Sequence, residues 1–572
     1  MKRRSFLRSI PSLAGASFAL NNLPVRVMAE QSHFLRLAEQ SDNDRVMVII
    51  QLHGGNDGLN TIIPVDQYDQ YYSRRANIAI PAKNSVRKYI PVDSTLSMAD
   101  QIGFHPDMIG AKDLYDRGRM SIVQGVSYPN NNGSHFRGRD IWQMGGGFDD
   151  YYSSGWVGRY LQQEYAPQVY PNDFPNSSMK DPLAIEIGGD VSLVFHQSGN
   201  IPTSISLPGS PEGFANLVAS LEGFEDELVD PRGKPPAYLD NSPYGKELNW
   251  ILDLEDKSED YAGRLLEVFN NSTDPKVTYP EIYPFNAPSG SLTNRLTPQL
   301  QLVTRLIEGG AKTKVYLLRI GGFDTHADQV ESYDPTMGGH AALMYHLSSA
   351  MNAFQADLRS KGLEDRVLSV TTSEFGRRID SNGSYGTDHG TGGPMFIFGK
   401  GVKPGVIGTN PDLSDRSKGN VSMQHDYRQV YASLLKDWML VDENIIANDI
   451  LFGNFIDGPK EDGSGNYEAL NLAQQQITGT QNFISKRFNL GNAFPNPAKD
   501  FTNISFTVNT TDAVKLNLID QKGMLIKSIL NENKGPGTYE LRLDLNGIKP
   551  GMYHYQIESG ILKTSKKLII KG

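Results

Sequence analysis

Four apolar stretches of the sequence each run into a loop that carries acid, base or hydroxyl side chains. The stretches are 45–52, 120–124, 314–320 and 367–372, and the polar residues after them are Asp57, Ser134, His135, Asp324, His326, Glu374, Asp388 and His389. Short apolar runs rich in β-branched residues are typical of strands buried on both faces. If the strands are parallel, these loops share the edge at which α/β sheets bind ligands. Their convergence predicts a functional site there.

The residue types in these loops favour a metal site. The chain has no cysteine, so an ion would take histidine and carboxylate ligands, which suit zinc or manganese. Asp324 and His326 are two residues apart, which puts both on one side of an extended segment, and His389 completes that first shell. Asp57 and Glu374 are candidates for a second ion. Two ions about 4 Å apart clamp an in-line displacement at phosphorus or sulfur, so we expect one or two divalent ions.

A serine and two arginines complete the expected chemistry. Ser134 is the candidate nucleophile, because a metal-bound alkoxide needs no separate base. Arg137 or Arg377 would grip the non-bridging oxygens of an ester through a planar guanidinium. Two other interpretations stay open, because Ser134 could cap the segment that runs to Trp142 and Asp57 beside a glycine is a common turn residue.

Length and charge restrict the protein class. The 572 residues exceed one ordinary domain, and the contents of 38% hydrophobic and 21% charged residues are those of a soluble globular chain. A net charge of −10 argues against nucleic acid or an anionic membrane as a partner. Residues 1–29 combine Arg3 and Arg4 with a short apolar stretch that is too broken for a membrane span, so we expect a signal peptide of twin-arginine type and no transmembrane anchor.

Strands and helices alternate between residues 40 and 455. Helical periodicity or helix signals mark 104–119, 292–309, 340–358 and 426–441, and a helical insertion is expected within 230–290. This alternation predicts a mostly parallel α/β sheet with helices on both faces. Residues 456–487 are typical of a linker. Residues 488–572 are predicted to form a small all-β sandwich, because short alternating runs occur at 502–508, 514–519, 524–530, 538–543, 552–558 and 562–570.

The motifs of the core, taken together, resemble domain-of-unknown-function family 1501, within the alkaline-phosphatase-like superfamily. They are LHGGNDGLN at 52–60, GSHFRGRDIW at 133–142, GGFDTHADQ at 321–329, SEFGR at 373–377, GTDHGTGG at 386–393 and HDYRQVY at 425–431. The superfamily includes alkaline phosphatases and sulfatases. The resemblance therefore implies an alkaline-phosphatase-like fold and a metal-dependent hydrolase of small-molecule or glycan esters.

The resemblance also implies roles for individual residues. Asp57 resembles an acid of the second ion and Ser134 the nucleophile, while Asp324 with His326 or His340 resembles the ligands of the first ion. His340 has a second interpretation as the first residue of a helix. Glu374 and Phe375 stand where phosphatases have an Asp-His pair, so the second ion would lose a ligand. If Asp388 and His389 are that pair, the alignment shifts.

The C-terminal residues resemble a type IX secretion sorting domain of type A. The motifs are FPNP at 494–497, the turn at 519–523, PGMY at 550–553 and the terminal KKLIIK. The resemblance implies recognition of residues 488–572 by the type IX machinery and a secreted or cell-surface location. We therefore expect an exported metal-dependent hydrolase of phosphate or sulfate esters. The alternatives are a non-catalytic surface binding or structural protein on the same scaffold, and a single ion that serves stability.

Overall fold

The structure is a computed structural model that describes residues 17–20, 23–26, 44–83, 85–166, 168–189, 191–221, 261–474, 488–508, 512–520, 524–559 and 562–571. It divides into two compact units, one of residues 1–160 and 174–473 and the other of residues 161–173 and 474–572. Most of the predicted signal peptide lies outside the described residues, as do residues 230–260 of the predicted insertion and 475–487 of the predicted linker. Among the described residues, none of the helices is both long and apolar enough for a membrane crossing.

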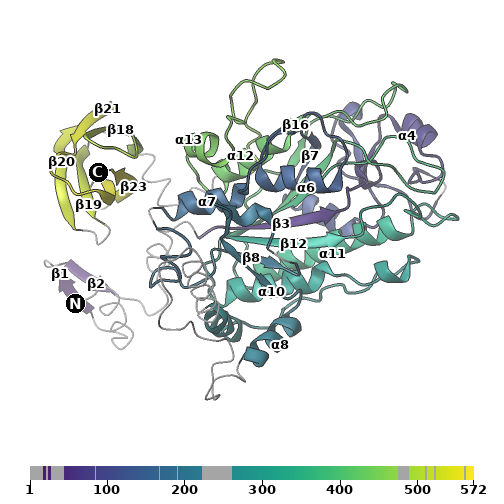
Figure 1. The fold of residues 1–572 in the computed structure, drawn as a ribbon, viewed down its shortest axis with the longest axis horizontal. Helices are drawn as coiled ribbons and strands as arrows, with labels where there is room; N and C mark the ends of the chain where they lie inside the picture. Colours follow the sequence, from purple (N-terminus) through teal and green to yellow (C-terminus); the bar gives the residue numbers. More distant parts are fainter. Residues whose placement is uncertain are drawn as a thin grey trace, which may run out of the picture. The chain divides into compact units, whose positions relative to one another are not determined.

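A nine-stranded sheet forms the centre of the first unit (Figure 1), with the order β11-β8-β12-β3-β13-β14-β7-β15 and β16 paired to β7. The strands are β3 (Val46–His53), β7 (Met120–Ser127), β8 (Ala184–Ile187), β11 (Ser204–Leu207), β12 (Val315–Gly321), β13 (Val367–Thr372), β14 (Gly393–Phe398), β15 (Gly405–Ile407) and β16 (His425–Asp426). Only β14 runs against its neighbours in this sheet. Because β14 lies between β13 and β7, it leaves those two strands pointing the same way, and the prediction of a mostly parallel sheet is confirmed.

Helices cover both faces of the sheet. Alternate residues of β3 from Val46 to Leu52 join one core cluster with side chains from α5 (Ile109–Asp116), α10 (Leu296–Glu308) and α11 (Gly339–Ser360). Ile49 and Gln51 face the other way, where they line a pocket with side chains of α6, α7 and α12. These helices are α6 (His135–Met144), α7 (Trp156–Glu164) and α12 (Tyr427–Asp437). Because successive side chains of a strand point to opposite faces, the side chains of β3 contact two different helix layers.

Shorter elements surround the sheet. A small sheet joins β4 (Ile62–Pro64), β6 (Ile102–Phe104) and β5 (Ile90–Pro91), beside α3 (Gly58–Thr61) and α4 (Tyr68–Arg74). The predicted helix 104–119 begins only at Ile109, because Phe104 pairs with Ile62 and Ile90 in that sheet. Other elements before the C-terminal strands are β1 (Ser17–Leu20), β2 (Leu23–Arg26), β9 (His196–Gln197), β10 (Ile201–Pro202), α8 (Pro211–Leu221) and α13 (Glu443–Ile445). Short 3-10 turns lie at Met98–Asp100, Leu193–Phe195 and Ser289–Ser291, and a π-helical turn lies at Ile446–Ile450.

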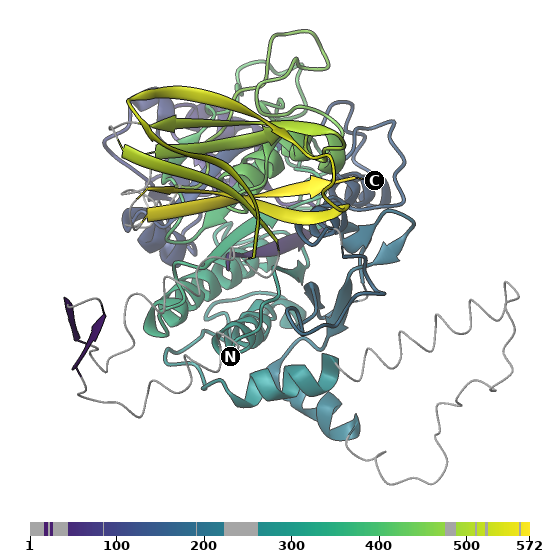
Figure 2. The same ribbon diagram turned by 90° about the vertical axis from the view of Figure 1, so that its left-hand side faces the viewer.

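The described part of residues 488–572 is all-β, as predicted. One sheet has the order β17-β18-β21 and the other β20-β19-β22-β23, and all neighbouring strands are antiparallel. The strands are β17 (Phe488–Phe494), β18 (Phe501–Val508), β19 (Asp512–Asp520), β20 (Leu525–Lys534), β21 (Gly537–Asp544), β22 (Gly551–Ser559) and β23 (Leu562–Ile570). The inward residues of both sheets form one core, which includes Phe506, Leu516 and Ile557. Figure 2 shows these strands in yellow and yellow-green.

Candidate metal centre

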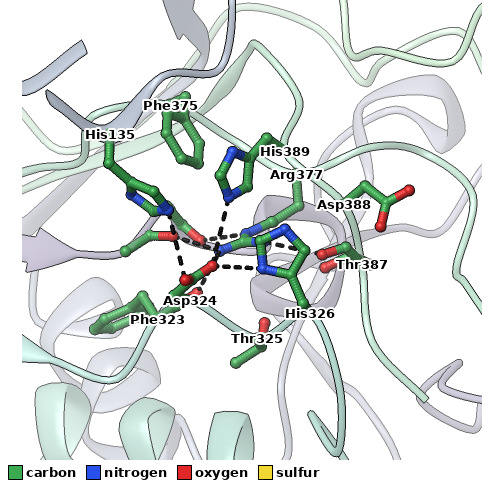
Figure 3. Close-up of polar contacts among 12 residues, drawn as sticks. His135, Phe323, Asp324, Thr325, His326, Phe375, Arg377, Thr387, Asp388 and His389 are labelled. Carbon is green, nitrogen blue, oxygen red and sulfur yellow. Dashed lines mark hydrogen bonds and ion pairs between the residues drawn. The ribbon is translucent and has the colours of Figure 1, made fainter. Parts of the chain in front are cut away.

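The candidate site lies at the carboxyl edge of the central sheet, where four segments meet (Figure 3). Asp324 follows β12, Arg377 follows β13, and His135 opens α6 after β7. His389 precedes β14, whose reversed direction brings its first residues to the same edge. An isolated bridge joins Arg377 to His389, so β14 supplies to the site a residue that a parallel strand would place at the opposite edge.

Close backbone packing brings these loops together. Gly54, directly after β3, has a φ of +123°, and a Cβ there would lie 2.3 Å from the backbone nitrogen of Asp324. Only glycine combines that conformation with that approach. Asn56 then bridges to Gly376, which extends the pairing of β3 and β13 beyond the sheet.

His135, Asp324 and His389 form a cluster that could hold a metal ion, since each offers one ligand atom and these atoms all lie within 4.8 Å of one another. The Nε2 atom of His135 is 3.5 Å from Oδ2 of Asp324, and Nε2 of His389 is 3.5 Å from Oδ1. A tetrahedral ion with ligands at about 2.1 Å separates its ligand atoms by about 3.4 Å. The two distances, which run to different oxygens of the carboxylate, are close to that spacing.

The other nitrogen of each imidazole is held by an acceptor. Nδ1 of His135 is 3.2 Å from Oε1 of Glu374, and Nδ1 of His389 is 2.6 Å from the carbonyl oxygen of Gly133. These contacts favour the tautomer with the proton on Nδ1, which leaves the lone pairs of both Nε2 atoms facing the Asp324 carboxylate. Nε2 of His389 is buried without a hydrogen-bond partner in the described part of the chain. Lone pairs and a carboxylate that face one another are stabilised by a cation, so these residues fit a metal ion.

The charge state of the cluster also suits a cation. Burial raises the pKa of Asp324, but the hydrogen bond and charge of Arg377, together with His326 and His135, outweigh burial and bring that pKa to about 2. Burial lowers the pKa of His389 below its usual range, and the carbonyl of Gly133 opposes the shift only in part. At neutral pH the carboxylate is therefore ionised and the His389 imidazole is neutral, which are the forms that bind metal.

Arg377 and His326 hold the Asp324 carboxylate from the side. Nη2 of Arg377 donates to Oδ1 at 2.7 Å, and Nδ1 of His326 is 2.7 Å from the same oxygen. Arg377 is buried, and its other nitrogens donate to the carbonyl oxygens of Gly55 and Thr387, each at 2.9 Å. Arg377 was expected to grip an ester, but its guanidinium is committed to the protein and orients Asp324 instead.

Ser134 and Arg137 lie at the start of α6. Ser134 is the N-cap, and its Oγ accepts from the backbone nitrogen of Arg137 at 3.3 Å. The Arg137 guanidinium is bound elsewhere, because Nη2 donates to the carbonyl oxygens of Phe148 and Asp150 and the guanidinium lies over the ring of Tyr151. The expectation that Arg137 grips an ester oxygen therefore needs correction, since these bonds direct its side chain to the loop 148–151.

Asp57 and His340 belong to a separate, fully buried network. Both oxygens of Asp57 accept from Arg75, at 2.8 and 2.9 Å, and one also accepts from Gln329 at 2.6 Å. Burial raises the pKa of Asp57, yet Arg75 and His340 together bring it below its usual range. His340 is buried beside His105, with ring centroids 6.0 Å apart. Arg75 thus supplies the positive charge that a second ion was expected to supply beside Asp57.

Two further predicted ligands lie outside the cluster. Asp388 is exposed, accepts from Nδ2 of Asn382 at 3.2 Å, and points away from Asp324 in Figure 3. Glu374 is 2% exposed, and its Oε1 accepts from the backbone nitrogen of Gly54 at 2.8 Å in addition to its contact with His135. Glu374 therefore contacts the cluster through His135 and not through the space between the ligand atoms.

The sequence interpretation did not assign His135 as a ligand. Ser134, the residue before it, was interpreted as a nucleophile. His135 nevertheless lies in a loop that follows a strand, as His326 does, and this position in the sequence could have identified it as a ligand. Phe375, where phosphatases have a histidine, packs its ring 4.8 Å from that of His135 and 4.4 Å from that of His389. An aromatic ring at this position fixes the orientation of two imidazoles and coordinates nothing.

Two families match segments of the chain. Residues 290–448 match the family described as "Protein of unknown function (DUF1501)", and residues 492–571 match the "Secretion system C-terminal sorting domain". The resemblance to both families is confirmed. The sorting domain marks the protein for the type IX secretion machinery and for secretion to the cell surface or beyond. A comparison with curated proteins finds no match.

Solved structures similar to the chain include members of the alkaline phosphatase and sulfatase class. An alkaline phosphatase superfamily protein from Vibrio parahaemolyticus is 8% identical, with 90% of this chain and 82% of that chain covered and a TM-score of 0.30. The PsFucS1 sulfatase from Pseudoalteromonas sp. is 12% identical, with coverage of 90% and 86% and a TM-score of 0.31. Latent PorU from Porphyromonas gingivalis is 23% identical over 14% of this chain, which spans only 9% of PorU, with a TM-score of 0.13. Likenesses this low carry no argument about activity.

Proposed function

We propose that the protein is an exported, metal-dependent hydrolase of phosphate or sulfate esters that uses one divalent ion, zinc or manganese, held by His135, Asp324 and His389. The observation that supports this proposal is the pair of 3.5 Å contacts from two imidazole nitrogens to one carboxylate, with both Nδ1 atoms already held. We propose one ion and not two, because Asp57, the acid expected for a second ion, has both carboxylate oxygens bonded to Arg75. Two histidines and an aspartate that leave a coordination position open are typical of catalytic rather than structural sites.

The exposure of the cluster supports access for a substrate. The side chain of Asp324 is 50% exposed and that of His326 is 46% exposed, whereas Glu374 and Arg377 behind them are buried. A divalent ion held by His135, Asp324 and His389 would supply Lewis-acid activation of an ester oxygen and of the attacking group. Arg377 keeps the carboxylate ionised and fixed in orientation. His326, with Nδ1 on Asp324, has Nε2 as the atom that can pass a proton to or from the reacting group.

Ser134 is the proposed nucleophile. Its Oγ uses an acceptor position in the helix cap, which leaves the hydroxyl proton free to be removed. The residue lies at the amino end of α6, where the helix dipole favours an alkoxide, and directly precedes the ligand His135. The Ser134 hydroxyl gives its proton to Nε2 of His326 and its oxygen attacks phosphorus or sulfur, while the bond to the ester oxygen breaks and the leaving alcohol takes up a proton. Water then hydrolyses the phosphate or sulfate ester formed on Ser134, which restores the hydroxyl.

The test combines elemental analysis of the folded protein with a panel of phosphate and sulfate esters. We expect about one equivalent of zinc or manganese per chain and turnover of at least one ester class. Ser134→Ala should lose at least 100-fold in turnover while it keeps the metal, with Ser349→Ala on α11 as the matched control. Protein that binds no ion after reconstitution would contradict the metal site. Full metal occupancy with no turnover of any ester would favour the alternative, a surface binding protein on the same scaffold.

A further inference from the structure

A pocket between the central sheet and helix α6 has no part in the proposed hydrolysis. Ile49 of β3 and Leu317 of β12 line it from the sheet, and Trp142 of α6 and Trp156 of α7 line it from the helices. The described residues that line it include none of the three proposed metal ligands. Small-molecule sites are mostly apolar pockets in which a few polar groups fix the ligand, so the polar residues of this pocket decide what it can bind.

The sequence of α6 places its polar pocket residues on one face of the helix. Arg139 lies four residues after the ligand His135, and Trp142 and Gln143 lie three and four residues after Arg139. Side chains at these spacings are neighbours on a helix surface. His135 contacts Glu374, and Glu374 lines the pocket together with Arg139, Trp142 and Gln143. The pocket therefore extends along this face of α6, with Glu374 between it and His135.

One oxygen of the Glu374 carboxylate remains available to the pocket. Oε1 is already used, because it accepts from the backbone nitrogen of Gly54 at 2.8 Å and lies 3.2 Å from Nδ1 of His135. Oε2 is buried and has no hydrogen-bond partner in the described part of the chain, and the residue is only 2% exposed. A buried acceptor without a donor keeps its desolvation cost, so a ligand that donates to Oε2 gains a bond that water cannot easily supply.

Two donors line the same pocket and have no acceptor of their own. Nε1 of Trp142 is buried without a hydrogen-bond partner among the described residues. The Arg139 guanidinium makes no hydrogen bond or ion pair with any of them and lies 5.7 Å from the ring centroid of Phe136. The Trp142 ring stacks on Tyr427 with centroids 4.6 Å apart, so its N–H is held in place before a ligand arrives. This side of the pocket suits an acceptor, and the charge of Arg139 favours an anionic one.

We propose that this pocket binds a small amino acid, whose ammonium group donates to Oε2 of Glu374 and whose carboxylate accepts from Arg139 and Trp142. The pocket offers one carboxylate and one guanidinium, so a molecule that carries both charges is complementary to it, whereas a simple amine or acid leaves one of them unpaired. A guanidinium suits a carboxylate because the two groups form parallel hydrogen bonds. Ile49 and Leu317 favour an apolar side chain on the ligand. The inference goes beyond the proposed hydrolysis and does not rest on it.

The test is calorimetric titration of the full-length protein with glycine, L-alanine, L-valine and 4-aminobutyrate. Isobutylamine and isovalerate, which each carry one of the two charged groups of valine, are titrated beside them. We expect at least one amino acid to bind, and each single-charge analogue to bind at least about tenfold more weakly. Arg139→Met should bind that amino acid about as weakly as the wild type binds isobutylamine, because both complexes lack the same ion pair. Glu374→Gln should weaken the amino acid about tenfold but should not weaken isovalerate.

The controls separate this pocket from general effects. Arg359→Met removes an exposed arginine from α11, in the helix layer on the other face of the sheet, and should bind like wild type. Trp142→Phe keeps the ring that stacks on Tyr427 and removes only the N–H, so it should weaken binding about threefold or more. No binding of any amino acid, unchanged binding in Arg139→Met, or equal affinity for isobutylamine and the amino acid would overturn the inference. Because no ester is turned over in this test, a protein that binds an amino acid but hydrolyses no ester would contradict the proposed function alone.

Discussion

Two aspartates at the same edge of the sheet end up in opposite environments. Asp324 follows β12 and contacts two imidazole nitrogens at 3.5 Å, beyond hydrogen-bond length, in a half-exposed site. Asp57 follows the neighbouring strand β3 and has both oxygens bonded to Arg75, with side chains 1% and 0% exposed. We call the first group the open cluster (His135, Asp324 and His389) and the second the closed network (Asp57, Arg75, Gln329 and His340). Asp324 also has a buried arginine beside it, but Arg377 bonds to its Oδ1, whereas Arg75 bonds to both oxygens of Asp57. A carboxylate at a sheet edge therefore favours a metal site where an arginine leaves one of its oxygens facing an imidazole nitrogen.

The largest expected effect is on the closed network. Arg75→Met leaves the Asp57 carboxylate buried without its counter-charge, and removal of one partner from a buried pair costs about 3–5 kcal/mol. Urea unfolding at pH 7 should show this loss, and Asp57→Leu combined with Arg75→Leu should recover part of it. Lys112→Met, which breaks the exposed pair with Asp116, is the control and should cost under about 1 kcal/mol. A small loss in Arg75→Met would mean that Asp57 has another cation, and the comparison would fail.

The pH dependence of stability tests the same network through His340. Burial, opposed by Asp57 and reinforced by Arg75 and Arg377, lowers the pKa of His340 from 6.5 to about 4. In the unfolded chain the imidazole takes up a proton near pH 6.5, but in the folded protein it does so only near pH 4. Stability should therefore fall as the pH drops from 6.5 through 4, by roughly 3 kcal/mol from this group.

Replacement of His340 isolates that contribution. His340→Gln removes the titrating group, so its unfolding free energy should fall less than that of wild type between pH 6.5 and 4, and the difference between the two curves is the quantity to measure. Parallel curves would show that His340 takes up its proton at the same pH in the folded and the unfolded protein, and burial would then not lower its pKa.

The strands of the core and several of its helices were predictable, because burial on both faces imposes an apolar run that is visible in the sequence. The predicted range 367–372 is the observed β13, and α11 at Gly339–Ser360 contains the predicted range 340–358. β17 (Phe488–Phe494) was not predicted, because its residues do not alternate cleanly and its pairing is broken by an irregularity after Leu490. Local pattern thus predicts an element where burial is uniform along it.

The edge of the sheet that carries the site was predictable too, but the ligand set was not. Asp57 and Asp324 have similar sequence surroundings, since each follows a strand and lies among glycines. What distinguishes them is Arg75, at the C-terminal end of α4, and no local spacing links that residue to Asp57. Likewise the reversed direction of β14, which delivers His389 to the site, depends on its pairing with β7 and β13. Long-range partners therefore decide which acid joins the candidate metal cluster and which is neutralised by an arginine.

Metal binding tests the open cluster through two adjacent residues. His389→Ala removes a nitrogen that faces Asp324, whereas Asp388→Ala removes an exposed carboxylate that faces elsewhere. We expect at least about 100-fold weaker zinc affinity for His389→Ala, since even residues that only support a ligand are worth 10–100-fold, and wild-type affinity for Asp388→Ala. Titration against a competing chelator measures both. Loss of affinity in Asp388→Ala instead would place the ion on the other side of this loop.

The smallest expected effect concerns Glu374, which contacts the open cluster but shares the burial of the closed network. Its Oε1 bonds to Gly54 and contacts His135, so it orients a ligand of the open cluster from a position as buried as the closed network. Glu374→Ala should weaken zinc affinity by about 10–100-fold without a change in the number of ions bound, because a supporting residue sets ligand orientation and basicity. Glu374→Gln keeps an acceptor for Nδ1 of His135 and should restore most of the affinity. If instead Glu374→Gln binds no ion where the wild-type protein binds one, Glu374 is itself a ligand of the open cluster.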